Sequence, residues 1–68
     1  MARERAIEPG ALYRKVGYGQ PVWRVDSLLR YAPLPHVKLT RMDQPAEHMT
    51  ISVATLNDPR FFQRVRTE

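Results

Sequence analysis

The sequence predicts a small all-β domain built from five short strands. Apolar and polar residues alternate with a period of two in several segments, most cleanly over residues 22–31 and 47–53, as half-buried strands require. Turns rich in proline or glycine, such as residues 17–21 and 32–35, separate these segments. A chain of 68 residues has room for one compact core, and it contains no cysteine that could cross-link that core.

The longest expected strand, Val22–Tyr31, contains the single tryptophan. Its alternation places Trp23 and Val25 on the buried side of the strand. The same alternation places Arg24 on the opposite side, with Leu28 beside it. Ten residues are long for a strand in a small domain, so we expect this strand to bend and to belong to two sheets.

Four shorter strands are expected around this long one. They comprise residues 11–16, 36–42, 47–53 and 61–65. In the last of them the alternation turns Phe61 and Val65 inward and leaves Phe62 outward or at an edge. Residues 54–59 are too short and polar for another strand, and they predict a single 3₁₀ turn that inserts Leu56 into the core. The expected core is Trp23, Val25, Leu39, Ile51 and Phe61.

This order of elements resembles the SH3-like small β-barrel, in which a long bent second strand is shared between two orthogonal sheets. The resemblance covers residues 9–65. The PGxxY entry at residues 9–13 and the VWRV segment at residues 22–25 are similar to small bacterial SH3-like proteins of uncharacterised function. The resemblance implies a closed five-stranded barrel with a short 3₁₀ turn before the last strand. An OB-like barrel is the alternative architecture.

The domain is expected to span residues 9–66, after a flexible basic arm over residues 1–8. Residues 1–10 contain no apolar run of the kind found in signal peptides. No stretch approaches the roughly 20 apolar residues of a membrane span. Together with the lack of cysteine, these features predict a compact cytoplasmic protein, of bacterial or viral type, that has no membrane partner.

Basic residues outnumber acidic ones by 11 to 7, and the isoelectric point is about 10.1. Nine of the basic residues are arginine, whose planar fork suits phosphate and carboxylate groups. Basic side chains interleaved with aromatic ones favour single-stranded nucleic acid. The alternative is an ordinary solvated surface, diluted by Asp26 and Glu47. The candidate nucleic-acid-binding residues are Arg14, Lys15, Tyr18, Arg24, Arg30, Lys38 and Arg64.

No catalytic or metal-binding motif accompanies these charges. His36 and His48 could meet across the hairpin of the third and fourth strands, but two imidazoles without thiolates make an incomplete zinc site. Asp43 and Asp58 stand at turns, where aspartate commonly bonds its own backbone. We therefore expect no enzymatic activity, no catalytic residues, no metal site and no cofactor.

Two kinds of binding module remain. The arginine surplus favours a module that binds RNA or single-stranded DNA, aided by the basic residues Arg3 and Arg5. The alternative is a protein–protein interaction or assembly adaptor module, because Leu28 and Leu29 put apolar side chains on both faces of the long strand. Exposed strand edges also allow a homodimer.

Overall fold

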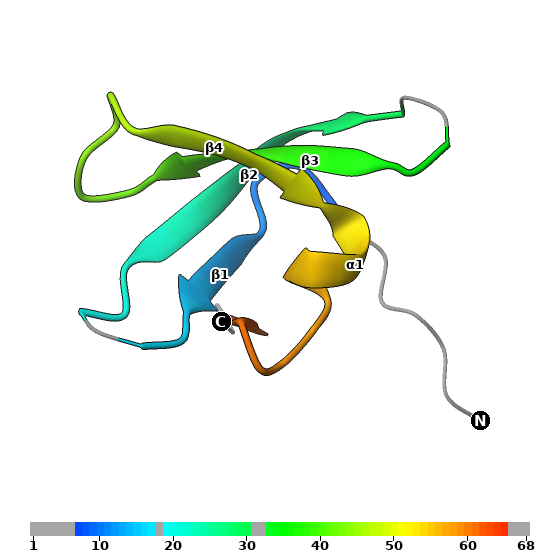
Figure 1. Cartoon of the computed structure of the whole chain (residues 1–68). Coiled ribbons are helices and arrows are strands. Elements are labelled where there is room, and N and C mark those ends of the chain that lie inside the picture. Colours follow the sequence, from blue (N-terminus) through cyan, green and yellow to red (C-terminus); the bar gives the residue numbers. More distant parts are fainter. Residues whose placement is uncertain (1–6, 18, 31–32, 66–68) are drawn as a thin grey trace.

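The computed structural model describes residues 7–17, 19–30 and 33–65. In this part of the chain, five antiparallel strands form one sheet in the order β4–β3–β2–β1–β5 (Figure 1). The predicted all-β class is confirmed. The elements in chain order are β1 (Leu12–Lys15), β2 (Val22–Leu29), β3 (His36–Arg41), β4 (His48–Ser52), α1 (Val53–Leu56) and β5 (Phe62–Arg64).

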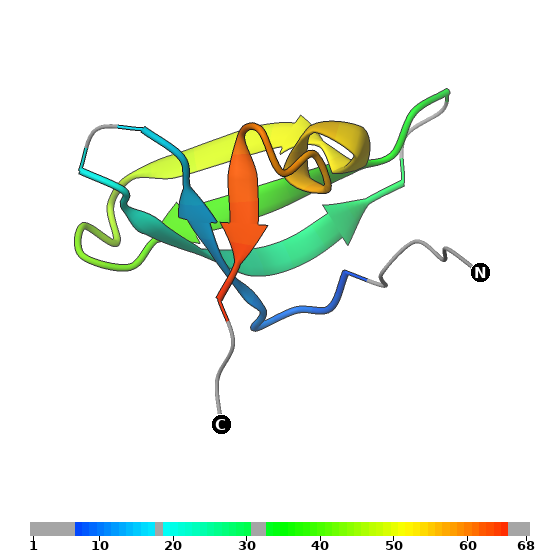
Figure 2. The same ribbon diagram turned by 90° about the horizontal axis from the view of Figure 1, so that it is seen from below.

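The sheet is open in the part of the chain that the structure describes. β4 and β5 form its two edges, and no ladder joins them. Instead, α1 contacts both β4 and β5 and lies between these edges (Figure 2). The number of strands and their antiparallel pairing therefore match the sequence-based expectation, whereas closure into a barrel is not observed.

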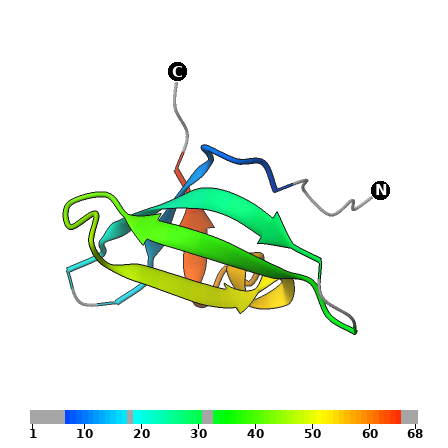
Figure 3. The ribbon, with the colours of Figure 1, turned by 90° about the horizontal axis from the view of Figure 1, so that it is seen from above.

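The long strand β2 takes part in both halves of the sheet. Its first half pairs with β1 and its whole length pairs with β3, so the sheet folds over along β2 (Figure 1). Seen from above, β2, β3 and β4 lie side by side, with β5 and α1 beneath them (Figure 3). The strand bends as predicted, but it belongs to one sheet, not to the two that the sequence led us to expect.

A β-bulge at Asp26 marks where β2 changes register. Val25 pairs with Leu39, but Ser27 pairs with Lys38, so Asp26 is the extra residue on β2. A bulge bends its strand and re-aims the side chains that follow it. Leu28 consequently pairs with a buried valine of β3 and packs against the core, although uninterrupted alternation predicted it on the outer face.

The core lies on the inner face of the folded sheet. Tyr13 of β1 is buried opposite Trp23 of β2. Leu56 is almost fully buried, as predicted, and Ile51 is partly buried against the cluster. The buried apolar residues are Ile7, Tyr13, Trp23, Val25, Val37, Leu39, Leu56 and Phe62.

The predicted orientation of the two adjacent phenylalanines is wrong. Phe62 is buried at 4% exposure, whereas Phe61 is 47% exposed. β5 pairs with β1 so that Phe62 opposes Lys15 and Arg64 opposes Tyr13. This register puts Phe62 on the same face as the buried Tyr13, and the period of two turns Phe61 outward.

A single turn of α-helix replaces the predicted 3₁₀ turn. The amide of Asn57 donates to the carbonyl of Val53 at 3.0 Å, which is the four-residue spacing of an α-helix. Ser52 caps the N-terminus, since its hydroxyl accepts from the amide of Thr55 at 3.1 Å. Among the described residues, no helix is long and apolar enough to cross a membrane.

Candidate nucleic-acid interface

Most acidic side chains in the described part of the chain form an ion pair with an arginine. Arg41 contacts both Asp43, at 2.7 Å, and Glu47, at 3.1 Å, in and beside the β3–β4 turn. Arg60 contacts Asp58 at 2.8 Å in the turn before β5. Hydrogen bonds from these arginines lower the pKa of Asp43 and of Asp58. The positive charge of the two arginines is therefore largely neutralised.

Five basic residues form no ion pair with any described residue. Three of them lie on the two strands β1 and β5, which contain no acidic residue within their bounds. Uncompensated positive charge is therefore concentrated where β1 and β5 meet. The five residues are Arg14, Lys15, Arg30, Lys38 and Arg64.

The outer face of the β1–β5 pair combines cationic, amide and apolar side chains. Arg14 pairs directly with Gln63, and both are exposed. The ladder continues one step further, because the amide of Val16 donates to the carbonyl of Phe61 at 2.9 Å. Val16 and Phe61 are exposed at 42% and 47%. We call these four residues, Arg14, Val16, Phe61 and Gln63, the β1–β5 patch.

Two further cations lie over aromatic rings on the inner face of the same strand pair. The Lys15 ammonium nitrogen is 5.7 Å from the centre of the Phe62 ring. The Arg64 guanidinium carbon is 6.0 Å from the centre of the Tyr13 ring. Both distances suit a cation–π interaction. The buried rings thus help to fix Lys15 and Arg64 beside the β1–β5 patch.

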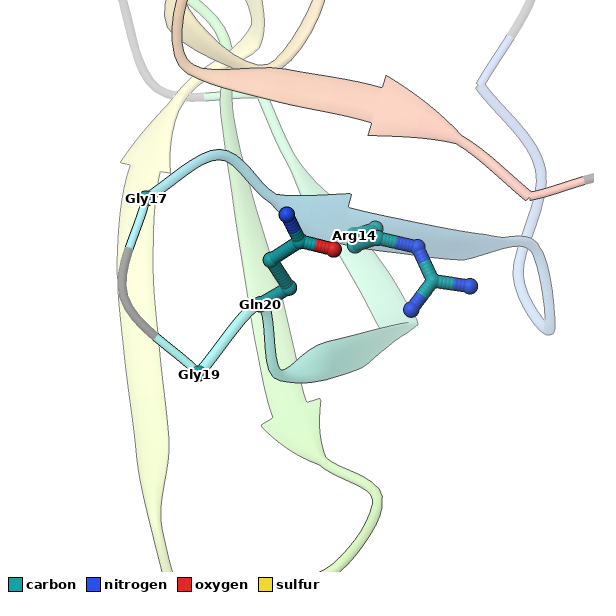
Figure 4. Close-up of a pocket in the computed structure, with 4 residues that line it drawn as sticks. All are labelled: Arg14, Gly17, Gly19 and Gln20. Atoms are coloured by element: carbon teal, nitrogen blue, oxygen red, sulfur yellow. The ribbon is translucent and has the colours of Figure 1, made fainter.

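A cavity of about 690 Å³ opens between β1 and the turn that links it to β2, lined by Arg14, Gly17, Gly19 and Gln20 (Figure 4). A second hollow of about 120 Å³ adjoins it and shares Arg14 and Gln20 with the first. Gln20 has a left-handed backbone, with φ of 43°. Few residues other than glycine adopt this conformation, because the side chain then crowds the backbone.

A polar network lies on the outer face of β2, β3 and β4. The hydroxyl of Thr40 donates to Asp26 and lies 3.0 Å from Nδ1 of His48. Since its one proton goes to Asp26, Thr40 accepts from Nδ1–H of His48. Asp26 also accepts from Arg24 at 3.4 Å. The Thr40 hydrogen bond and the charge of Arg24 lower the pKa of Asp26, although partial burial opposes them.

The two histidines do not meet across the β3–β4 hairpin, contrary to the expectation from sequence. His36 pairs with Ser52 at one end of the hairpin and His48 pairs with Thr40 at the other. Antiparallel pairing of β3 and β4 forces this separation. In the described ranges, no group of three or more potential ligands is placed to hold a metal ion.

The predicted binding residues fall into separate groups in the structure. Arg14, Lys15 and Arg64 come together on β1 and β5. Arg24 and Lys38 lie on the outer face of β2 and β3, and Arg30 follows the end of β2. Tyr18, the aromatic residue of the predicted site, lies outside the described residues, as do Arg3, Arg5 and Tyr31.

Sequence reasoning missed four residues of this region, namely Phe61, Val16, Gln20 and Gln63. A signal for the first existed, because two adjacent phenylalanines in a strand point to opposite faces and one of them must leave the core. The Arg60 guanidinium carbon lies 5.4 Å from the centre of the exposed Phe61 ring. No pattern in the sequence pointed to the two glutamines.

Comparison of the chain with protein-family models, with curated proteins and with solved structures finds no match.

Proposed function

We propose that this protein is a non-enzymatic module that binds single-stranded nucleic acid, RNA or DNA, through the β1–β5 patch with Lys15 and Arg64. One observation carries the proposal. An exposed aromatic ring, that of Phe61, stands on a strand pair whose three basic residues form no ion pair with a described residue. Bases stack on such rings, and free cations neutralise the adjacent phosphates.

We propose a single-stranded ligand because the β1–β5 patch exposes an aromatic ring and apolar surface, which only unpaired bases can contact. Stacking on Phe61 requires an unpaired base whose flat face is accessible. Val16 extends the apolar surface next to that ring. A duplex would present mainly phosphates to this patch, and the apolar side chains would gain nothing from them.

We further propose that the fold is an SH3-like barrel. Its support is the strand order, the bend of β2 and the one-turn helix before β5. This fold hosts many kinds of binding, so it does not choose the ligand. The cytoplasmic location remains a prediction from sequence.

The test uses the only two lysines of the chain as a matched pair. Binding of a fluorescent dT 12-mer and of the matching rU 12-mer is measured by anisotropy across a salt series. Lys15→Gln should weaken binding and make the log–log salt dependence shallower by about 0.7, the value for one phosphate contact on a single strand. Lys38→Gln removes the same charge from the outer face of β3 and should leave both quantities close to those of the parent.

Two results would reject the proposal. One is the absence of oligonucleotide binding by the parent protein at low salt. The other is an equal loss in both lysine variants, which would indicate a diffuse effect of net charge rather than a defined interface.

A protein–protein interaction module remains the second candidate, because the open sheet offers two strand edges, β4 and β5. Such edges accept an added strand from a partner chain or from a second copy in a homodimer. Leu34 and Met42 also stand exposed on the surface. This candidate predicts association that barely depends on salt, in contrast to phosphate binding.

A further inference from the structure

We infer that the side chains of Arg14, Gln20 and Gln63 form a subsite that reads the edge of one unpaired base and prefers guanine. This inference rests on the proposed function, because it names the base that the β1–β5 patch would select. Arg14 and Gln20 line both neighbouring hollows beside β1, and Gln63 lines the smaller one. All three side chains therefore line the smaller hollow, of about 120 Å³.

None of these three groups has a hydrogen-bonding partner elsewhere in the described chain. Arg14 forms no ion pair with a described residue, while Arg24, Arg41 and Arg60 each contact a carboxylate. Neither glutamine makes a side-chain hydrogen bond to a described residue, and Gln63 stands exposed opposite Arg14. Within the described residues, their donors and acceptors remain free for a ligand.

The backbone at Gln20 adds an independent observation. A left-handed conformation is strained for glutamine, and residues held this way cluster at functional sites. Glycine would adopt the same φ of 43° without strain. The glutamine side chain instead extends toward Arg14 at the wall of the cavity (Figure 4). In this view the carboxamide points toward the start of the Arg14 side chain, and the guanidinium extends away from the turn (Figure 4).

The chemistry of the three groups selects the base. A guanidinium only donates, so its fork fits an edge with two adjacent acceptors, which guanine offers at O6 and N7. A carboxamide oxygen can accept the N1–H and N2–H donors that guanine presents on its other edge, and both edges are free in a single strand. Adenine offers the fork one acceptor beside a donor, so it should bind less well. Phe61, on the same face of β5, is placed to stack the base or its neighbour.

The experiment compares four 12-mers, which are an all-dT strand and the same strand with one central dG, dA or dC. The parent protein should bind the dG strand about tenfold more tightly than the all-dT strand, the discrimination of one good bidentate contact. The dA and dC strands should fall between them, because adenine offers the fork one acceptor beside a donor, and cytosine offers two adjacent acceptors, N3 and O2, with only one donor group beside them. The double variant Gln20→Gly, Gln63→Ala keeps the Arg14 fork and should reduce the dG preference, measured as the ratio of the dG to the all-dT affinity, to about threefold.

The variant is designed to fold. Gln20→Gly relieves the left-handed strain, and Gln63 is exposed, so its thermal midpoint should not fall below that of the parent. Equal binding of all four strands by the parent would overturn the subsite and leave the proposed function intact. A dG preference as large in the double variant as in the parent would overturn the assignment to the glutamines. Failure of every strand to bind at low salt would overturn the proposed function and the subsite together.

Discussion

Basic side chains lie in two regions of this small molecule, the outer face of β2 and β3 and the β1–β5 pair. The two regions differ in whether carboxylates neutralise those side chains. On the outer face of β2 and β3, Arg24 contacts Asp26, and Asp26 also receives the hydroxyl of Thr40. On β1 and β5, Arg14, Lys15 and Arg64 contact no described carboxylate. The difference teaches that a net charge of +4 says little by itself. Where the few carboxylates stand decides which basic residues remain available to a ligand.

The placement of those carboxylates follows from local structure. Asp26 occupies the β-bulge, and Asp43 and Asp58 stand in turns, where each bonds a neighbouring arginine. Exposed ion pairs of this kind add little stability. Their main effect here is to neutralise Arg24, Arg41 and Arg60, so that the unpaired basic residues of the described chain are Arg30, Lys38 and the three on β1 and β5.

The largest expected effect separates the two faces of β5. Phe62→Ala should lower the free energy of unfolding by about 3–5 kcal/mol, because it leaves a cavity beneath the β1–β5 pair. Phe61→Ala should change it by less than about 0.5 kcal/mol, as is usual at the surface, while it weakens oligonucleotide binding by about 1–3 kcal/mol. Urea unfolding and anisotropy measure the two quantities. If Phe61→Ala lowers the free energy of unfolding as much as Phe62→Ala does, the ring belongs to the core. If it leaves oligonucleotide affinity unchanged, the ring takes no part in binding.

The next largest expected effect is a loss of stability when the polar network on the outer face of β2, β3 and β4 is broken. Thr40→Val should cost about 1–3 kcal/mol of stability, because the hydroxyl is buried and both Asp26 and His48 lose a partner. The control is Thr50→Val. Thr50 lies on β4, on the same outer face of the sheet as Thr40, but it is exposed and makes no side-chain hydrogen bond to a described residue. The measurement is the urea unfolding midpoint of both variants, and only Thr40→Val should lower it. Equal midpoints would show that the network contributes nothing to stability.

The smallest effect is on pH dependence, and it tests the neutralising carboxylates directly. The folded state lowers the pKa of Asp26, of Asp43 and of Asp58, in each case chiefly through a side-chain hydrogen bond. Their stabilising contribution is therefore present above the ordinary carboxyl pKa of about 4, and it is lost as the pH falls through the lower folded values. Urea midpoints should be flat near neutral pH and decline below about pH 4.

Asp26→Asn is the variant that checks this origin. Its own share of the stability is already missing at neutral pH, so its urea midpoint should fall less between pH 7 and pH 3 than that of the parent. An equally steep fall would show that Asp26 takes no part. The same substitution removes the negative charge beside Arg24 on the outer face of β2, away from the β1–β5 patch, so oligonucleotide affinity should stay close to that of the parent, as for Lys38→Gln.

Much of the fold could be predicted because its signals are local. Alternation located β2, β3 and β4 within one or two residues, and the Pro/Gly turns separated them. The buried positions of Trp23, Val25 and Leu39 followed from the same period. The prediction failed where pairing with a distant strand determines which face a side chain points to. The bulge at Asp26 depends on β3, and the orientation of the Phe61–Phe62 pair depends on β1.

The candidate site was less predictable, for a related reason. Sequence identified Arg14, Lys15 and Arg64 as basic residues, but it did not show which of the chain's arginines would be paired with carboxylates. Such pairing depends on turns and cross-strand neighbours. Gln20 could not be predicted as a site residue for another reason. What distinguishes it is a backbone angle more typical of glycine, and the sequence does not show this angle.

The ladder between β1 and β5 joins the two most widely separated strands of the chain. Val16 bonds to Phe61, and Val65 bonds to Leu12, across about 50 intervening residues, so closing this loop has a high entropic cost. Contacts between distant residues slow folding, and we expect this ladder to form late. A ligand that holds β1 and β5 together would oppose its opening, so a bound oligonucleotide should slow amide hydrogen exchange in β5 more than in β3.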